Sequence, residues 1–267
     1  MSIITIFGTL LDLSVDGTNL STYEFYTYDI RKPLTPRQKV STIDIPKRQN
    51  QIVAYKKFIE NKLIAYGYVE GTSYDNTVTR MEALAGALYS DDDVELIPSN
   101  QTDRYWNGQY LDYNIVTVKD SYSIVNLEFT CHDPFAYAVT ADDSDNTITT
   151  LDDTFVIANS GHYLAYPVIT VTFNQAQSHL YIENQNIADN RIDISKSFSA
   201  SDELELDTKN ETIKLNGTSS PIGLGDGGKS MAEFILLKKG NNTISVGSDD
   251  ETIDVSVNVT FNKTYLY

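Results

Sequence analysis

Alternating apolar and polar side chains recur along most of the chain and predict β-strands. In the segment DVSVNVTF, four apolar residues fall on one face, since successive side chains of a strand point to opposite faces. These residues are Val255, Val257, Val259 and Phe261. A similar mixture of β-branched and aromatic residues predicts strands at 116–118, 123–129, 166–173 and 204–206. Clusters of Asn, Asp, Gly, Ser and Thr separate these segments, as expected for turns.

One segment departs from this pattern and predicts a helix over residues 80–89. Its apolar side chains recur at spacings of three and four, which places them on one stripe of a helix. The residues of this stripe are Met81, Leu84, Ala85 and Leu88. Thr79 and Glu82 match the capping-box pattern at the start of a helix. We expect the apolar stripe to pack on a sheet.

The composition changes at residues 141–150, ADDSDNTITT, where acidic and polar turn-forming residues precede a new series of strands. A chain of 267 residues is long enough for two ordinary domains. We therefore place a boundary here, which gives domains at residues 1–140 and 141–267. Because proline disfavours helical backbone at the residue before it, Pro134 predicts that the first domain's last strand ends near Cys131.

Bulk composition excludes several classes of site. No run of eighteen apolar residues occurs, and the N-terminal segment lacks the basic start of a signal peptide, so we expect neither a membrane span nor a signal peptide. Cys131 is the only cysteine, which excludes an intramolecular disulfide and a cysteine-clustered zinc site. The three histidines lack the helical spacing of a zinc protease, and no nucleophile-elbow serine is present.

Charge is distributed unevenly along the chain. The formal net charge of −17 argues against nucleic acid as an affinity ligand. Residues 31–62 nevertheless hold nine of the twenty basic residues and two carboxylates, a net charge of +7. This basic strip is either a solvated face or a surface that docks on an acidic surface of an identical neighbour. The residues that we expect at such a protomer contact are Arg31, Lys32, Arg37, Lys39, Lys47 and Arg48.

The segment GLGDGGKS, residues 223–230, matches the phosphate-loop pattern of a nucleotide-binding enzyme. Such a loop follows a buried parallel strand and opens a helix, whereas turn-forming residues precede this one. We expect a strand at 231–237 and a turn at 239–242, which leaves no room for the rest of a nucleotide-binding fold. A glycine-rich hairpin loop is therefore the favoured interpretation, and nucleotide binding is a third hypothesis for the chain.

Acidic clusters and one aromatic segment could in principle bind ligands. The clusters at 91–93, 142–145 and 249–251 lack the full signature of a calcium loop, so we interpret them as solvated turns. Trp106, in DRYWNGQYLDY, could stack on a sugar ring, although cross-strand packing explains the same aromatic residues. We expect no catalytic residues, no metal and no cofactor, and therefore no enzyme.

The order of several segments resembles the distal tail protein (Dit) family of siphophages. At 157–171, an Asn-x-Gly element, a proline and an alternating strand resemble the opening of the family's C-terminal domain. Further segments follow in the family's order, at 204–217, 234–247 and 255–266, with a glycine-rich loop between the first two. At 126–137, NLEFTCHDPFAY resembles the strand and Asp-Pro-aromatic signature that ends the family's N-terminal domain.

This resemblance, which covers most of residues 40–267, implies a mainly β fold. It implies an N-terminal split β-barrel-like domain with one helix and a C-terminal galectin-like β-sandwich. It further implies a virion protein at the phage tail tip or baseplate, made in the bacterial cytoplasm. Six copies would form a ring that joins the tail tube to the tail-tip hub, with receptor-binding parts at its periphery. An acidic ring would let DNA pass without binding it.

A second hypothesis comes from a different class of protein. The chain could be a carbohydrate-binding or host-adhesion β-sandwich module of a tail tip, with Trp106 or C-terminal tyrosines in contact with glycan. A galectin-like shape does not by itself carry galectin activity. No sugar-binding motif of the true lectins is visible in the sequence.

Overall fold

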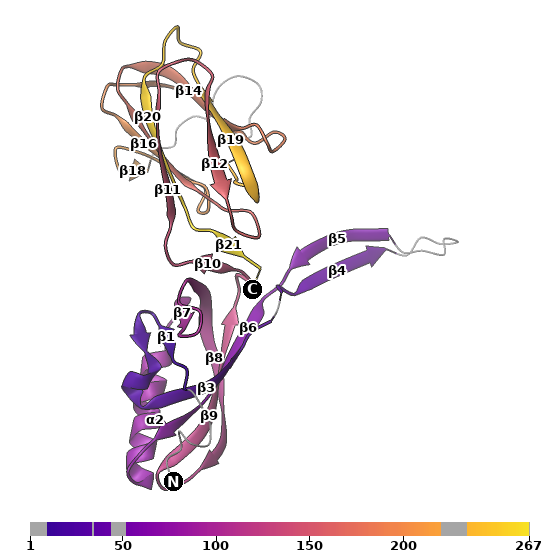
Figure 1. Ribbon diagram of the computed structural model, residues 1–267, viewed down its shortest axis with the longest axis vertical. Coiled ribbons are helices and arrows are strands. Elements are labelled where there is room, and N and C mark those ends of the chain that lie inside the picture. Colours follow the sequence, from indigo (N-terminus) through magenta and orange to yellow (C-terminus); the bar gives the residue numbers. More distant parts are fainter. Residues whose placement is uncertain (1–9, 34, 44–51, 220–233, 267) are drawn as a thin grey trace. The chain divides into compact units, whose positions relative to one another are not determined.

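The computed structural model of the chain describes residues 10–33, 35–43, 52–219 and 234–266. It is mainly β, with several antiparallel sheets and, in the described residues, one α-helix (Figure 1). The chain divides into two compact units, the second of which is Thr140–Tyr265. Unit 1 ends at Val139 and also includes Leu266.

Unit 1 contains a twisted antiparallel sheet with the strand order β2-β1-β7-β8-β9-β6-β3. Its strands are β1 (Leu13–Val15), β2 (Thr18–Asn19), β3 (Phe25–Arg31), β6 (Asn61–Glu70), β7 (Val94–Pro98), β8 (Arg104–Val118) and β9 (Tyr122–Cys131). The short strand β10 (Ala136–Ala138) pairs with the first part of β8, and a 3-10 helix, η1 (Leu20–Tyr23), precedes β3. As predicted, β9 ends at Cys131, and β10 follows it.

Alternation of buried and less buried side chains along most of β6 and β9 gives this sheet one core face. Leu127 and Phe129 of β9 are buried, and they pair with Ala65 and Leu63 of β6. Gly67 of β6 is required by close packing, because a Cβ atom there would lie 2.4 Å from Cζ of Phe25. Packing this close leaves no space for a larger side chain.

The helix α2 (Tyr74–Leu88) covers the core face of the sheet. It starts six residues earlier than the sequence pattern predicted, because Ser73 is its N-cap and accepts a hydrogen bond from the backbone N–H of Asn76 at 3.3 Å. Thr79 lies inside the helix, where its hydroxyl donates to the carbonyl oxygen of Asp75. The predicted capping box at Thr79 was therefore wrong, although the predicted stripe does place Leu84 and Leu88 in the core.

Strands β4 (Gln38–Ile43) and β5 (Ile52–Phe58) form a hairpin that we call the arm. They pair with each other in a separate two-stranded sheet, and with no other described strand (Figure 1). Every side chain of the arm that the structure describes is exposed or half-buried. The arm therefore owes little of its conformation to the core of unit 1.

Unit 2 contains two antiparallel sheets that share one hydrophobic core. The larger sheet has the order β11 (Asp142–Ile148), β20 (Val255–Phe261), β13 (Val168–Phe173), β16 (Glu203–Asp207), β17 (Thr212–Leu215), β18 (Thr218–Ser219). The smaller has the order β12 (Asp153–Asn159), β19 (Gly240–Gly247), β14 (Gln177–Asn184), β15 (Arg191–Phe198). A short strand, β21 (Thr264–Tyr265), lies near the end of the chain. The predicted alternation of β20 is confirmed, with all four apolar residues of its one face buried.

Two local predictions for unit 2 were wrong. The acidic segment at 142–145, interpreted as a solvated turn, is part of β11, an edge strand paired only with β20. Its alternate side chains are exposed because successive side chains of a strand point to opposite faces. The described part of the strand expected at 231–237 makes only a single bridge, between Leu237 and Ala165. Strand β19 instead begins at Gly240, within the expected turn. The segment at 223–230 lies outside the described residues.

Candidate assembly interface

The arm concentrates positive charge without a compensating carboxylate. Strands β4 and β5 contain Lys39, Lys56 and Lys57 and no acidic residue. Lys39 and Lys57 occupy directly opposite positions of the hairpin. Two like charges at opposite positions destabilise a strand pair. Within the described residues, none of the three ammonium groups forms an ion pair, so the arm carries charge that its own fold does not use.

The arm also exposes large apolar side chains. Val40, Ile43, Val53 and Tyr55 are between 47% and 56% exposed. The pairing register places Tyr55 on the opposite face of the hairpin from Val40 and Lys56, so neither face is purely polar. A mixed apolar and basic hairpin of this kind is typical of a surface that becomes covered on association.

Lys32 lies at the base of the arm and is held in an unusual environment. Its ammonium group lies 4.2 Å from the centre of the Trp106 ring, a cation–π contact. Burial, and then the nearby positive charge of Arg104, lower the pKa of Lys32 to about 8. Trp106 is itself only 5% exposed, so its ring offers little surface to a sugar.

The other residues of the basic strip have different surroundings. Arg31 forms an ion pair with Asp29 at 2.8 Å, and Lys62 forms one with Glu128. Arg37 is exposed at the entry to the arm. Lys47 and Arg48 lie outside the described residues. The structure therefore separates two paired cations of the strip from an unpaired group on the arm.

The paired cations lie on the face of the sheet opposite helix α2. The register of β8, β9 and β6 places Asp112, Glu128 and Ile64 side by side on this face, while Leu127 and Ala65 face the helix. Asp112 adds a further carboxylate. The central part of this open face thus carries no unpaired cation among the described residues, a property that the sequence could not show.

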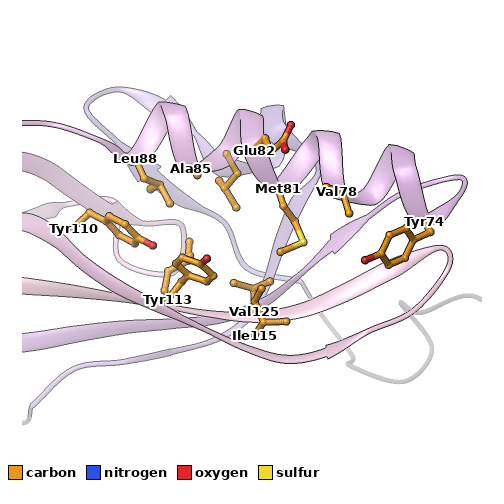
Figure 2. A pocket seen from close by; sticks show the side chains of 12 residues that line it. Tyr74, Val78, Met81, Glu82, Ala85, Leu88, Tyr110, Tyr113, Ile115 and Val125 are labelled. Carbon is orange, nitrogen blue, oxygen red and sulfur yellow. The ribbon is translucent and has the colours of Figure 1, made fainter.

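An apolar groove lies between helix α2 and the strands β8 and β9 (Figure 2). Its volume is about 310 Å³. Its lining consists of Tyr74, Val78, Met81, Glu82, Leu84, Ala85, Leu88, Tyr110, Tyr113, Ile115, Val125 and Leu127. Figure 2 shows Met81 of the helix pointing toward the strands that carry Tyr113 and Val125. Burial, and then Asp112 and Tyr113, raise the pKa of Tyr110 to about 12, so its hydroxyl stays neutral.

Only part of this groove could be predicted from the sequence. The predicted helical stripe contains Met81, Leu84, Ala85 and Leu88, all of which line it. The stripe was expected to pack on a sheet, and its residues Leu84 and Leu88 are buried, whereas Ala85 is exposed. Because β8 and β9 lie far from the helix in sequence, no local pattern could reveal an open space between them.

Unit 2 carries a polar cluster on β14 and β15 whose groups satisfy one another. His179 is buried, with Nε2 2.6 Å from Oδ1 of Asp193, and its Nδ1 accepts a hydrogen bond from the backbone N–H of Asp249. Burial would raise the pKa of Asp193, but hydrogen bonds from His179 and Arg191 outweigh it and lower the pKa. The guanidinium of Arg191 also lies 3.7 Å from the ring centre of Tyr181, which covers that ring.

The described residues contain no cluster of three or more His, Cys, Asp or Glu side chains arranged to bind a metal ion. Burial raises the pKa of Cys131 to about 12, so its thiol is a poor nucleophile at neutral pH. No described helix is long and apolar enough to span a membrane.

Comparison with known proteins gives one family match, in unit 2, and similar solved structures. Residues 160–265 match the family model described as "Siphovirus-type tail component, C-terminal domain". The crystal structure of the phage SPP1 Dit protein is similar, with 16% identity, a TM-score of 0.80 and coverage of 97% of this chain and 100% of that chain. A structure of the phage P2 baseplate, in its activated conformation with Ca, gives 10% identity, a TM-score of 0.48 and coverage of 94% and 97%. No curated protein sequence gives a significant match.

Proposed function

We propose that this chain is a structural protein of a phage tail. Its fold is Dit-like, and the expected resemblance to the siphovirus Dit family is confirmed. In this proposal it is a distal tail protein at the tail tip or baseplate of the virion. The observation that carries the proposal is the likeness of fold to the SPP1 Dit protein across both units, with the family match in unit 2.

The proposed assembly is a ring of six copies. Residues 1–140 form the ring, as a split β-barrel-like domain, and residues 141–267 form a galectin-like sandwich that projects from it. The arm supports a role in the protomer contact, because it combines unpaired lysines with exposed apolar side chains. Such groups gain most from a partner that covers the apolar side chains and supplies carboxylates.

The ring would join the tail tube to the tail-tip hub and let DNA pass. The open face of the unit 1 sheet supports DNA passage, because its cations Arg31 and Lys62 are each paired with a carboxylate. A surface whose cations are already neutralised releases no counterions from DNA and has little affinity for it. The tube, hub and peripheral receptor-binding proteins are therefore the proposed partners.

The mass and shape of the purified protein test this function. We expect light scattering across a range of concentrations to detect six-subunit particles, and negative-stain images to show a ring with a central hole. Reversing two arm charges, Lys39→Glu with Lys57→Glu, should shift the particles toward monomer. A matched reversal on an exposed turn of unit 2, Lys209→Glu, should leave them intact.

The contrary result would favour the adhesion hypothesis. A protein that stays monomeric at every concentration, and that binds on a glycan array, would contradict the ring proposal. Charge reversals on the arm would then leave both the mass and the glycan binding unchanged.

A further inference from the structure

We propose that the groove between helix α2 and strand β8 receives the β4–β5 arm of a second copy of this chain. This inference rests on the proposed function, since it names the surface that one protomer offers to the arm of another. The groove and the arm both belong to unit 1, and no residue of the arm lines the groove of its own chain.

The groove is an apolar surface that the described residues of the chain leave uncovered. Its floor is formed by Leu127 and Val125 of β9, and two tyrosines stand at its rim, Tyr74 at 55% and Tyr113 at 52% exposure. Figure 2 shows these two rings on opposite sides of the groove, one from the helix and one from the sheet. Aromatic side chains that border an apolar hollow are typical of protein-binding sites.

The arm has the matching apolar groups. Val40, Val53 and Tyr55 are each about half exposed, although such side chains are usually buried in a stable hairpin. A groove of about 310 Å³ has room for side chains of this size to enter. Docking would therefore remove apolar surface from water on both sides of the contact.

Charge complementarity identifies the arm as the occupant. Glu82 lines the groove, and the acidic segment 91–93 follows helix α2, whose last residue, Leu88, also lines it. The side chain of Gln109, which is next to the lining residue Tyr110, donates to the carbonyl oxygen of Asp91 at 3.2 Å and so holds this segment near the groove. Asp92 and Asp93 are the next two residues, and both are exposed.

The lysines of the arm supply the opposite charge. Lys39 and Lys57 repel each other across the hairpin, and a carboxylate from a second copy would relieve this repulsion. No other described pair of strands in unit 1 joins exposed apolar residues with unpaired lysines in this way. Opposite charges at the rim would also steer the two surfaces into register.

Cysteine cross-linking between two differently marked copies tests the contact. One full-length variant carries Val40→Cys on the arm, and the other carries Ala85→Cys in the groove. The matched control carries Ala83→Cys, which is exposed on the same helix but does not line the groove. Cys131 is 1% exposed and its pKa is raised, so the unsubstituted chain should give no background with a short thiol-specific cross-linker.

We expect mixed Val40→Cys and Ala85→Cys chains to give a cross-linked dimer, and the Ala83→Cys control to give a much weaker one. Adding Lys56→Glu and Lys57→Glu to the arm should lower the initial rate of cross-linking roughly tenfold, with the loss shrinking at high salt. Circular dichroism melts would confirm that each variant is folded.

Three outcomes separate this inference from the proposed function. If six-subunit rings form and the Ala85 variant cross-links no better than the Ala83 control, the groove assignment is wrong while the ring stands. If Val40→Cys and Ala85→Cys react only when both are in the same chain, the arm docks within its own chain and the inference is again wrong. Absence of any assembly by light scattering would contradict the proposed function itself.

Discussion

The polar groups of two regions differ in their surroundings: the buried amides of unit 2 have protein partners, whereas the polar groups of the unit 1 arm are exposed to solvent. In unit 2, Asn242 is fully buried, and its side chain hydrogen-bonds to both the backbone N–H and the carbonyl of Lys238. The amide of Asn184 in turn donates to Asn242 at 2.9 Å. These groups replace water completely with protein partners, so they hold the loop before β19 in place.

The arm of unit 1 leaves its polar groups to the solvent. Its lysines have no ion pair among the described residues, and its apolar side chains are about half exposed. The described buried amides of unit 2 thus find their partners within the chain, whereas the arm of unit 1 leaves lysines and apolar side chains exposed. Four substitutions, one in unit 2 and three in unit 1, should change stability by amounts that decrease in the following order.

Removing the amide of Asn242 should destabilise unit 2 most. Asn242→Ala removes the side-chain partner of the backbone N–H and carbonyl of Lys238 and one of the two acceptors of the Asn184 amide, at a cost of about 3 kcal/mol in the free energy of unfolding. The single tryptophan, Trp106, lies in unit 1, so its fluorescence reports that unit, while circular dichroism reports both. In urea unfolding, the part of the dichroism change that comes from unit 2 should move to a lower urea concentration, while the midpoint of the fluorescence transition should not change.

Asn241, the exposed neighbour of Asn242, provides the control for this experiment. Asn241→Ala should leave both transitions within about 0.5 kcal/mol of the parent protein. Equal losses for the two variants would mean that the buried amides contribute little beyond the strand itself.

A methyl group at Gly67 should destabilise unit 1, so the Trp106 fluorescence, and not the unit 2 part of the dichroism, should now change at the lower urea concentration. Gly67→Ala forces a Cβ atom against Phe25 and the carbonyl oxygen of Tyr26, which costs about 2 kcal/mol. The Trp106 fluorescence transition should shift to lower urea. Gly86→Ala, in an open part of helix α2, should instead stabilise by about 0.5–1 kcal/mol.

Removing the N-cap of helix α2 should have a smaller effect on the same unit. Ser73→Ala loses the hydrogen bond to the N–H of Asn76 and should cost about 1 kcal/mol. Thr79→Ala, within the helix, should cost less because Thr79 caps no terminal N–H group. If urea unfolding showed a larger loss of stability for Thr79→Ala than for Ser73→Ala, helix α2 would begin near residue 80, as the sequence pattern predicted.

The charge on Lys32 should have the smallest effect and depend on pH. Because its folded pKa is about 8, below that of an unfolded lysine near 10.4, the unfolded state binds more protons between these values. The unfavourable charge is present below pH 8, so this group should make the fold more stable as pH rises from about 8 to 10.5. Lys32→Met should stabilise unit 1 at pH 7, and the difference from the parent should shrink toward pH 10.5.

Local sequence patterns determined the strands and part of the helix of this protein. The alternation in β20 and β9 needs no distant partner, because every second side chain of a strand faces the same side. The apolar stripe of α2 was visible for the same reason. The basic strip was also visible, since it is a matter of composition alone.

Only the tertiary structure decided where those elements begin and which charges are paired. Ser73, and not Thr79, caps the helix, and the polar segment of β11 became a strand because β20 pairs with it. Asp29 pairs with Arg31, while Lys62 pairs with Glu128, which is distant in sequence. Such pairs, and the groove beneath α2, depend on which strands the fold brings together. A local pattern of residues cannot predict this, because the strands are far apart in the sequence.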